Sequence, residues 1–502
     1  MASLIRTLTS NPLPSILLAI SVLLVGINLF NFPYYESDEG TYMSQAWSVV
    51  TQSRLSPYVY TYDHAPAGWL LIAFWSVVSG GFDTFGYSIN SGRILILVLH
   101  FFTSLLLFLV TKKTSSSNWT AVIALLFFSL TPLSIYYHRR VLLDNIMVFW
   151  VFFSLYFLTY HQTKFGQILS ALTFGIALLT KETAIFFIPG FIFLLFTSTN
   201  IARYRLVLLW LFMVGLVVSI YPIWAYSQDQ LFPPGMFGSE PTLHPSLIGS
   251  ILTQLNRSGG SPLSPTSALQ QNIWLWFRED PLLVIIGFSS LLANIILSFK
   301  YRLSLTPLLF VLPMLVFFVR GGVIFEFYLI PLIPFLAMSV SAFLKIISDY
   351  WGNLKIYLVA LSLLLIINLV YFGNKARGGF NIFRANQTKS QIEATEWILS
   401  QNQPSSFWAI DQPMYLDMVI RNQNNFNHAY YYWKIETDPT VKDQLLSGNP
   451  QNINYLAVTP QMEADIVNAQ MAFMSSALSS SEIVKIFEND GWRVIIRSNF
   501  VP

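Results

Sequence analysis

Cysteine is absent from this 502-residue chain, and charged residues make up only 11% of it. Without cysteine, the protein has neither disulfides nor thiolate metal sites. The net charge of +3 is too small to indicate nucleic-acid binding, and no nucleic-acid motif is present. Hydrophobic residues account for 54% of the chain and the mean hydropathy is +0.55. This composition excludes a soluble enzyme and is typical of a helical membrane protein with several spans.

Long apolar runs recur from about residue 14 to residue 371. Because a helix needs about 20 apolar residues to cross a bilayer, eleven membrane-spanning helices are predicted. They cover residues 14–32, 92–110, 119–137, 141–160, 167–180, 183–196, 206–226, 281–299, 303–319, 323–346 and 356–372. Lysine and arginine occupy alternate short loops, and such loops stay in the cytoplasm. The N-terminus is therefore predicted inside, and the C-terminus outside, a plasma (inner) membrane.

The polar segments suggest a membrane domain at residues 1–373 and a soluble extracytoplasmic α/β domain at 374–502. External loops are predicted at 33–91 and 227–280, and the second is rich in proline, glycine and serine, as a mobile lid would be. Periodicity predicts amphipathic stretches near 41–52 and 69–79, C-terminal helices at 391–400 and 481–489, and strands at 407–410, 455–458 and 492–497.

Ionisable side chains gather where the predicted spans meet the external side. They are Asp38, Glu39, His64, Arg139, Arg140, Asp144, Lys181, Glu182 and Arg320. Each charge costs free energy close to hydrocarbon. Both signs at the ends of separate helices therefore indicate a functional site at this edge of the membrane.

Asp38 and Glu39 follow the first predicted span directly. A carboxylate there can take a proton from an acceptor hydroxyl or amine, as a general base does. The same residues also suit a helix N-terminus, where Ser37 or Asp38 would cap the helix and negative charge is favourable. Spacing alone leaves both interpretations open.

Arg139 and Arg140 occupy a very short external turn, against the tendency of basic residues to stay inside. Guanidinium groups match phosphate oxygens, so the pair predicts an anion site. Asp144 could orient Arg140 at i,i+4 spacing. The alternative is an anchor for lipid headgroups together with that local ion pair.

Lys181 and Glu182 lie at another external turn, and Arg320 lies at a third, shortly before Tyr328. Each could be a snorkelling residue, but three basic helix ends on one side favour a phosphate site. His64 could shuttle a proton, bind a metal or start a helix. His244 could be a second ligand or a solvated loop residue.

Taken together, these segments resemble the GT-C class of membrane glycosyltransferases, in particular the branch of aminoarabinose transferase and the protein O-mannosyltransferases. The matching elements are Asp38-Glu-Gly-Thr-Tyr42, His64-Ala-Pro66, Arg139-Arg-Val-Leu-Leu-Asp144, Leu179-Thr-Lys181 and Tyr328-Leu-Ile-Pro-Leu-Ile-Pro334. Their order covers the first two thirds of the chain. The resemblance implies a polytopic α-helical fold of the GT-C kind with a small α/β domain after it.

The resemblance also implies an inverting transfer of a sugar from a polyprenyl-phosphate donor to a lipid, glycan or protein acceptor on the external face. Asp38 would be the base, with Glu39 shaping the acceptor site. The donor phosphate would be held by Arg139 or Arg140, Lys181, Arg320 and Tyr328, with support from His64, Asp144 and Glu182.

Two positions depart from the family pattern. His64-Ala-Pro-Ala67 lacks the fuller proline pair, and Glu326 stands where a basic or aromatic residue is usual. A divalent metal therefore stays an open question, and nothing in the sequence requires one. The competing hypothesis is a transporter or flippase of an anionic lipid-linked sugar. Such a protein should carry its charges near the bilayer midplane, whereas here they lie at one edge.

Overall fold

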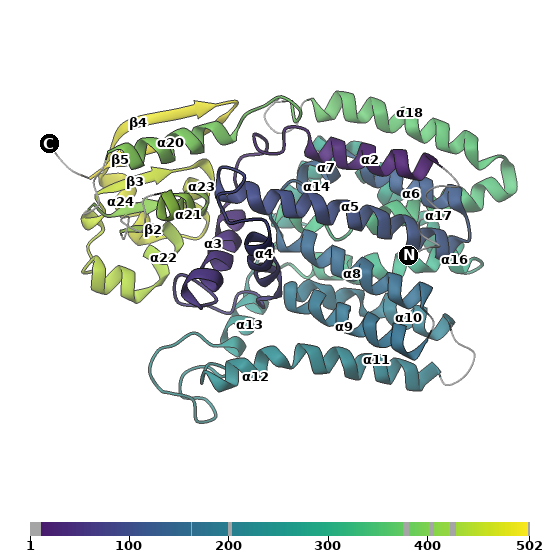
Figure 1. The fold of residues 1–502 in the computed structure, drawn as a ribbon, viewed down its shortest axis with the longest axis horizontal. Coiled ribbons are helices and arrows are strands. Elements are labelled where there is room, and N and C mark those ends of the chain that lie inside the picture. The colour runs from purple at the N-terminus through teal and green to yellow at the C-terminus, as the bar shows by residue number, and fades with distance from the viewer. Residues whose placement is uncertain are drawn as a thin grey trace.

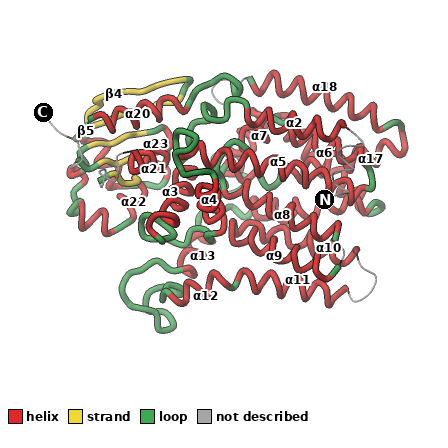
Figure 2. Tube along the Cα trace, viewed as in Figure 1, coloured by secondary structure: helices red, strands yellow, loops and turns green. Residues whose placement is uncertain are grey.

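The computed structural model describes residues 12–161, 163–198, 203–374, 381–401, 406–421 and 428–499. Most of these residues are helical. The helices form an elongated bundle, and a smaller unit that contains the sheet lies at one end of it (Figure 1). Figure 2 shows the strands confined to that end.

The bundle runs from α2 to α18, and several of its helices meet at short 3₁₀ or π segments. The helices are α2 (Pro12–Gly26), α3 (Ser37–Gln52), α4 (Ala67–Val78), α5 (Ser88–Ser115), α6 (Asn118–Leu130), α7 (Pro132–Tyr137), α8 (Leu143–Tyr160), α9 (Lys164–Thr180), α10 (Ile188–Ser198), α11 (Arg203–Val218), α12 (Ile220–Ser227), α13 (Leu247–Asn256), α14 (Ala268–Glu279), α15 (Phe288–Ser298), α16 (Arg302–Val319), α17 (Ile333–Trp351) and α18 (Leu354–Gly373). The short segments are η1 (Glu182–Phe187), η2 (Leu283–Gly287) and η3 (Glu326–Leu329).

Within the described residues, six helices are long and apolar enough to cross a membrane, or seven if a pair bent by 114° counts as one span. They are Ser88–Ser115, Leu143–Tyr160, Tyr204–Ser227, Arg302–Val319, Glu326–Trp351 and Leu354–Gly373, and the bent pair is Ala268–Glu279 with Leu283–Ser298. All eleven predicted spans are largely helical, but the count of eleven is not reproduced. Helix α9, for example, has 17 residues and extends only about 26 Å, less than the ~30 Å hydrocarbon core.

The spans differ in how far the protein itself buries them. The window within Glu326–Trp351 is 83% buried, so this span lies at the centre of the bundle. The windows within Tyr204–Ser227 and Leu354–Gly373 are only 17% and 28% buried. These two run along opposite sides of the bundle (Figure 1), where their exposed apolar side chains would meet lipid.

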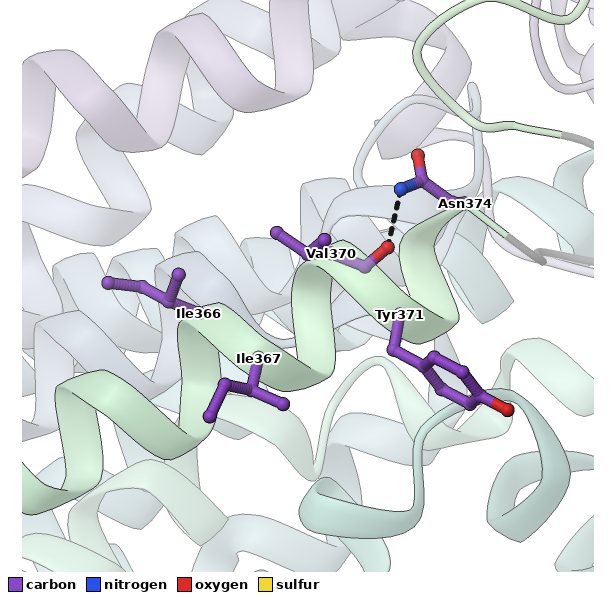
Figure 3. Close-up of a pocket in the computed structure, with 5 residues that line it drawn as sticks. All are labelled: Ile366, Ile367, Val370, Tyr371 and Asn374. Carbon is purple, nitrogen blue, oxygen red and sulfur yellow. Dashed lines mark hydrogen bonds between the residues drawn. The ribbon is translucent and has the colours of Figure 1, made fainter.

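Helix α18 carries a shallow apolar hollow on its outer side (Figure 3). It is lined by Ile366, Ile367, Val370 and Tyr371 of this helix and by Asn374, which directly follows it. None of the ionisable residues singled out in the sequence lines it. We therefore regard the hollow as part of the lipid-facing surface.

The C-terminal unit is a mixed sheet of five strands in the order β2-β1-β3-β5-β4. Strands β2 and β3 run parallel to β1, and β5 runs antiparallel to both β3 and β4. The strands are β1 (Trp408–Ile410), β2 (Ala429–Tyr431), β3 (Tyr455–Val458), β4 (Glu482–Asn489) and β5 (Trp492–Ser498). The helices are α20 (Thr388–Ser400), α21 (Gln412–Arg421), α22 (Tyr432–Thr437), α23 (Pro460–Asn468) and α24 (Ala472–Ser480), with η4 (Thr440–Leu445) and η5 (Pro450–Asn452).

The predicted helix at 391–400 and the strands at 407–410, 455–458 and 492–497 are confirmed. The predicted helix at 481–489 is wrong, because these residues form strand β4. Asp490 and Gly491 join β4 to β5 with φ values of 45° and 74°. An Asp-Gly pair with positive φ at both positions makes a tight hairpin turn, and this signal outweighs the apparent helical periodicity.

The two amphipathic stretches predicted in the first loop are confirmed as α3 and α4. Helix α3 lies between the bundle and the C-terminal unit (Figure 1). The second loop, predicted as a lid, contains α13 and α14. Its Gly259 N–H donates to the carbonyl of Gly321 at 2.8 Å, which fixes this loop against the end of α16.

Candidate active site

Asp38 is the second residue of α3 and is partly buried. The Tyr42 hydroxyl, one turn further on, lies 3.5 Å from Asp38 Oδ2. Burial raises the pKa of Asp38 above its usual value, and the Asp144 and Asp465 carboxylates add to this increase. The charges of Lys181 and His64 oppose it. A carboxylate whose pKa is raised in this way is better matched to proton transfer near neutral pH.

Glu39, the next residue, is fully buried and faces the protein interior. Its two oxygens accept from Arg93 Nε at 3.0 Å and Arg93 Nη2 at 2.8 Å, and it also accepts from the backbone N–H groups of Val141 and Glu36. Glu36 is the N-cap of α3, and the pair Glu36 and Glu39 forms a capping box. The predicted cap, Ser37 or Asp38, is therefore wrong, because Glu36 caps α3 and these two residues are the first of the helix. That Glu39 shapes the binding site of the sugar acceptor stays a prediction.

Arg93 was not recognised in the sequence, where it follows Gly92 at the start of an apolar run. It is fully buried and also donates to the carbonyls of Leu29 and Tyr34. A charge inside an apolar helix requires a partner. That rule marks Arg93 as paired, but it does not identify Glu39 as the partner.

Arg140 is fully buried and is held by two carboxylates and a tyrosine. Its Nη1 contacts Glu36 and lies 3.3 Å from Glu326 Oε1, and its Nη2 donates to the Tyr136 hydroxyl at 2.6 Å. The ring of Tyr34 lies against the guanidinium, 4.8 Å from its carbon. Arg140 therefore joins the start of α3 to α7 and η3.

Arg139 is also fully buried, but its hydrogen bonds go to backbone carbonyls. It donates to Ile382 at 2.7 Å and to Leu24 at 2.8 Å. The ring of Phe383 lies beside it, with 5.8 Å between the ring centroid and the guanidinium carbon. These contacts fasten the segment after α18 to α2.

Asp144 pairs with Lys181, with 2.5 Å between Oδ2 and Nζ, and not with Arg140 as expected. The i,i+4 argument requires both residues to lie on one helix. Helix α8 begins only at Leu143, so Arg140 lies in the turn before it. Lys181 also lies 4.8 Å from the ring centroid of Tyr328. The structure thus brings together two predicted phosphate ligands, Lys181 and Tyr328, and the charge of Lys181 acts on Asp38.

His64 and Glu182 form a second pair close to Asp38. The distance from His64 Nδ1 to Glu182 Oε2 is 2.9 Å, and the Ala65 N–H donates to Glu182 Oε1 at 3.1 Å. Burial lowers the pKa of His64, but the Glu182 carboxylate raises it more, so the net pKa is above its ordinary value. The imidazole ring lies 6.5 Å from the ring of Tyr42.

Arg320 is exposed at the end of α16, where its guanidinium carbon lies 4.3 Å from the ring centroid of Phe317. A second cation, Arg257, was missed in the sequence because it stands alone in the long external loop. It lies over Phe325, with 5.9 Å to the ring centroid, and the rings of Phe325 and Tyr328 are 5.6 Å apart. Phe325 therefore lies against both Arg257 and Tyr328.

His244 lies apart from these residues, and its Nδ1 is 2.9 Å from the carbonyl of Pro245. Among the residues that the structure describes, no group of three or more histidine, aspartate or glutamate side chains is placed to hold a metal ion. The question of a metal stays open. The chemistry available is a carboxylate of raised pKa beside a cluster of lysine, tyrosine and arginine.

A family model described as dolichyl-phosphate-mannose-protein mannosyltransferase matches residues 63–226. No curated protein matches the chain by sequence. The fold is similar to ArnT from Cupriavidus metallidurans, solved with undecaprenyl phosphate, with a TM-score of 0.59 and 12% identity over 97% of this chain and 98% of that one. It is also similar to the oligosaccharyltransferase AglB from Archaeoglobus fulgidus, solved with an inhibitory peptide and dolichol-phosphate, with a TM-score of 0.59 and 12% identity over 98% and 74%.

At this identity, the likeness to solved structures concerns the fold. Together with the family model, it confirms the predicted resemblance to GT-C glycosyltransferases of the aminoarabinose and protein mannosyltransferase kind. The findings support a multi-pass membrane protein. They give no support to the transport alternative.

Proposed function

We propose that this chain transfers a sugar from a polyprenyl-phosphate donor to a hydroxyl or amine of a lipid, glycan or protein acceptor, with Asp38 as the general base. The observation that carries the proposal is the position of Asp38, a carboxylate of raised pKa within the electrostatic reach of Lys181. The folds of ArnT and AglB, whose structures hold polyprenyl phosphates, support the donor class.

The donor phosphate would bind beside Lys181 and Tyr328, with Arg257 closing the site from the external loop. An ammonium group has three N–H donors. Lys181 can therefore keep its bond to Asp144 and still donate to a phosphate oxygen. Arg320, at the exposed end of α16, would attract the anionic lipid from outside.

The proposed reaction is a single displacement, which inverts the anomeric carbon. Asp38 takes the proton of the acceptor as the acceptor oxygen or nitrogen bonds to the anomeric carbon. The bond from that carbon to the phosphate oxygen breaks, and its electron pair stays on the phosphate. Lys181 and Tyr328 stabilise the charge that develops there, which lowers the barrier because these groups interact more strongly with the transition state than with the bound donor.

Arg139 and Arg140 would stabilise the site indirectly, through the segments that they hold in place. Arg140 holds Glu36, the cap of the helix that carries Asp38. In this arrangement the reaction takes place on the external side of a plasma (inner) membrane, with the N-terminus in the cytoplasm and the C-terminal unit, residues 374–502, outside.

The test is sugar transfer by purified protein in lipid, from a panel of radiolabelled polyprenyl-phosphate sugars. Asp38→Asn should lower the rate of transfer about 10²-fold to 10⁴-fold, and the matched control Asp83→Asn, an exposed carboxylate in the same external segment, should leave it unchanged. Transfer that survives in Asp38→Asn would remove Asp38 from the mechanism. Movement of labelled lipid across the bilayer without a glycosylated product would favour a transporter instead.

A further inference from the structure

The first turn of α3 is also held by the C-terminal unit. The Ser37 hydroxyl donates to Asp411 Oδ1 at 2.5 Å, and the Ser37 N–H donates to Gln461 Oε1 at 3.4 Å. Asp411 is fully buried, and its second oxygen accepts from the Thr459 hydroxyl at 2.6 Å. A buried aspartate therefore links the residue before Asp38 to the sheet.

The sheet topology explains why Asp411 and Thr459 meet. Asp411 directly follows β1, and Thr459 directly follows β3. These strands are adjacent and parallel, so both residues lie at the same carboxyl edge. In open α/β sheets this edge is where ligands bind. Here the first turn of α3 occupies it.

The approach of α3 to the C-terminal unit extends to the backbone. A Cβ atom added to Gly40 would lie 2.3 Å from the carbonyl carbon of Gln412 and 2.4 Å from the nitrogen of Pro413. Both contacts are with backbone, which cannot rotate away as a side chain could. Only glycine permits this separation between α3 and α21.

Asp38 thus lies between two anchored neighbours. Ser37 is bonded to Asp411 of the C-terminal unit, and Glu39 is bonded to Arg93 of the bundle. The contact of Asp38 with Tyr42 is long, at 3.5 Å. The position of its carboxylate is therefore set mainly by the turn that carries it.

We propose that Asp411 is a positioning residue for the reaction, which through Ser37 fixes the place where Asp38 meets the acceptor. This inference rests on the proposed role of Asp38. It gives the C-terminal unit a part in catalysis, because a general base must stay within hydrogen-bond reach of the proton that it takes. A displacement of about 1 Å can lower a rate 10²-fold.

The chain offers a matched control in a second link of the same kind. Ser88, the first residue of α5, donates its hydroxyl at 2.7 Å and its N–H at 2.9 Å to Asp417 on α21. Both serines are buried and begin a helix of the bundle, and both aspartates belong to the C-terminal unit. Only the link through Ser37 is next to Asp38.

The experiment compares Ser37→Ala with Ser88→Ala in the full chain in lipid, by steady-state kinetics and by amide hydrogen exchange of residues 36–44. We expect Ser37→Ala to lower kcat about 10-fold to 100-fold with little change in the KM for donor, and to speed exchange in this turn. Ser88→Ala should lower thermal stability to a similar extent but leave kcat and exchange in the turn close to wild type.

Equal kcat and equal exchange in the two variants would overturn the inference. If exchange is faster in Ser37→Ala but Asp38→Asn transfers sugar at the wild-type rate, the bond from Ser37 to Asp411 does order the turn. Asp38 is then not the general base, and the proposed function fails. If Ser37→Ala does not fold, Asp411→Asn, of nearly the same shape, takes its place and is compared with Asp417→Asn.

Discussion

Two helix ends of this protein carry basic residues that look alike in sequence, but the structure uses them differently. Arg140 is enclosed by Glu36, Glu326 and Tyr136. Among the residues that the structure describes, Lys181 forms an ion pair with one carboxylate, Asp144, and it faces aromatic rings near Asp38. A basic residue at a membrane edge is thus a scaffold residue when several anions already surround it. It is available to a ligand when it is paired with one carboxylate only.

The largest expected effect is on stability, at Arg140. Arg140→Met should destabilise the protein by about 3–5 kcal/mol, because it removes the cation that pairs with the buried Glu36 and partly buried Glu326 carboxylates. Thermal unfolding in detergent measures this change. A melting temperature like that of wild type would show that Arg140 does not hold the scaffold, and would return it to the list of phosphate ligands.

The next largest effect is expected on donor binding, at Lys181. Lys181→Met combined with Asp144→Asn removes both charges of the buried pair, so stability should change little. Donor binding should weaken by about 1.5–3 kcal/mol, roughly 10-fold to 100-fold, because a charge-assisted hydrogen bond to phosphate is lost. Equilibrium binding of the labelled donor measures it. Unchanged binding would mean that the phosphate lies elsewhere.

A smaller effect concerns pH. The charge of His64 lowers the pKa of Asp38, and the raised pKa of His64 keeps the imidazole charged across the acid limb of the activity profile. His64→Gln removes that charge, so the pKa of Asp38 should rise further. The acid limb of kcat/KM should then move to higher pH. An acid limb at the same pH as in wild type would show that it does not follow the titration of Asp38.

Several features could be predicted from the sequence because their signals are local. The turn around Asp38 and the apolar helices belong to this group. The pairing of charges could not be predicted in the same way. Arg93 with Glu39, and Lys181 with Asp144, join residues 54 and 37 positions apart, and spacing along the chain does not report such contacts. The sequence suggested Arg140 as the partner of Asp144 from i,i+4 spacing alone, and this spacing brings side chains together only within one helix.

The number of spans could not be predicted for a different reason. Apolar composition marks helices 10–17 residues long, such as those at Lys164–Thr180 and Asn118–Leu130, as clearly as it marks longer ones. Length decides whether a helix alone can cross the membrane. The helix ends are set by caps and by packing, which composition does not report.

The most direct test of the central claim is the single-turnover rate of sugar transfer in Asp38→Asn, measured at saturating donor together with the donor affinity. The account predicts a rate about 10²-fold to 10⁴-fold lower, the usual contribution of a general base, with donor affinity close to wild type. A wild-type rate in this variant would contradict the account and place the reaction away from Asp38.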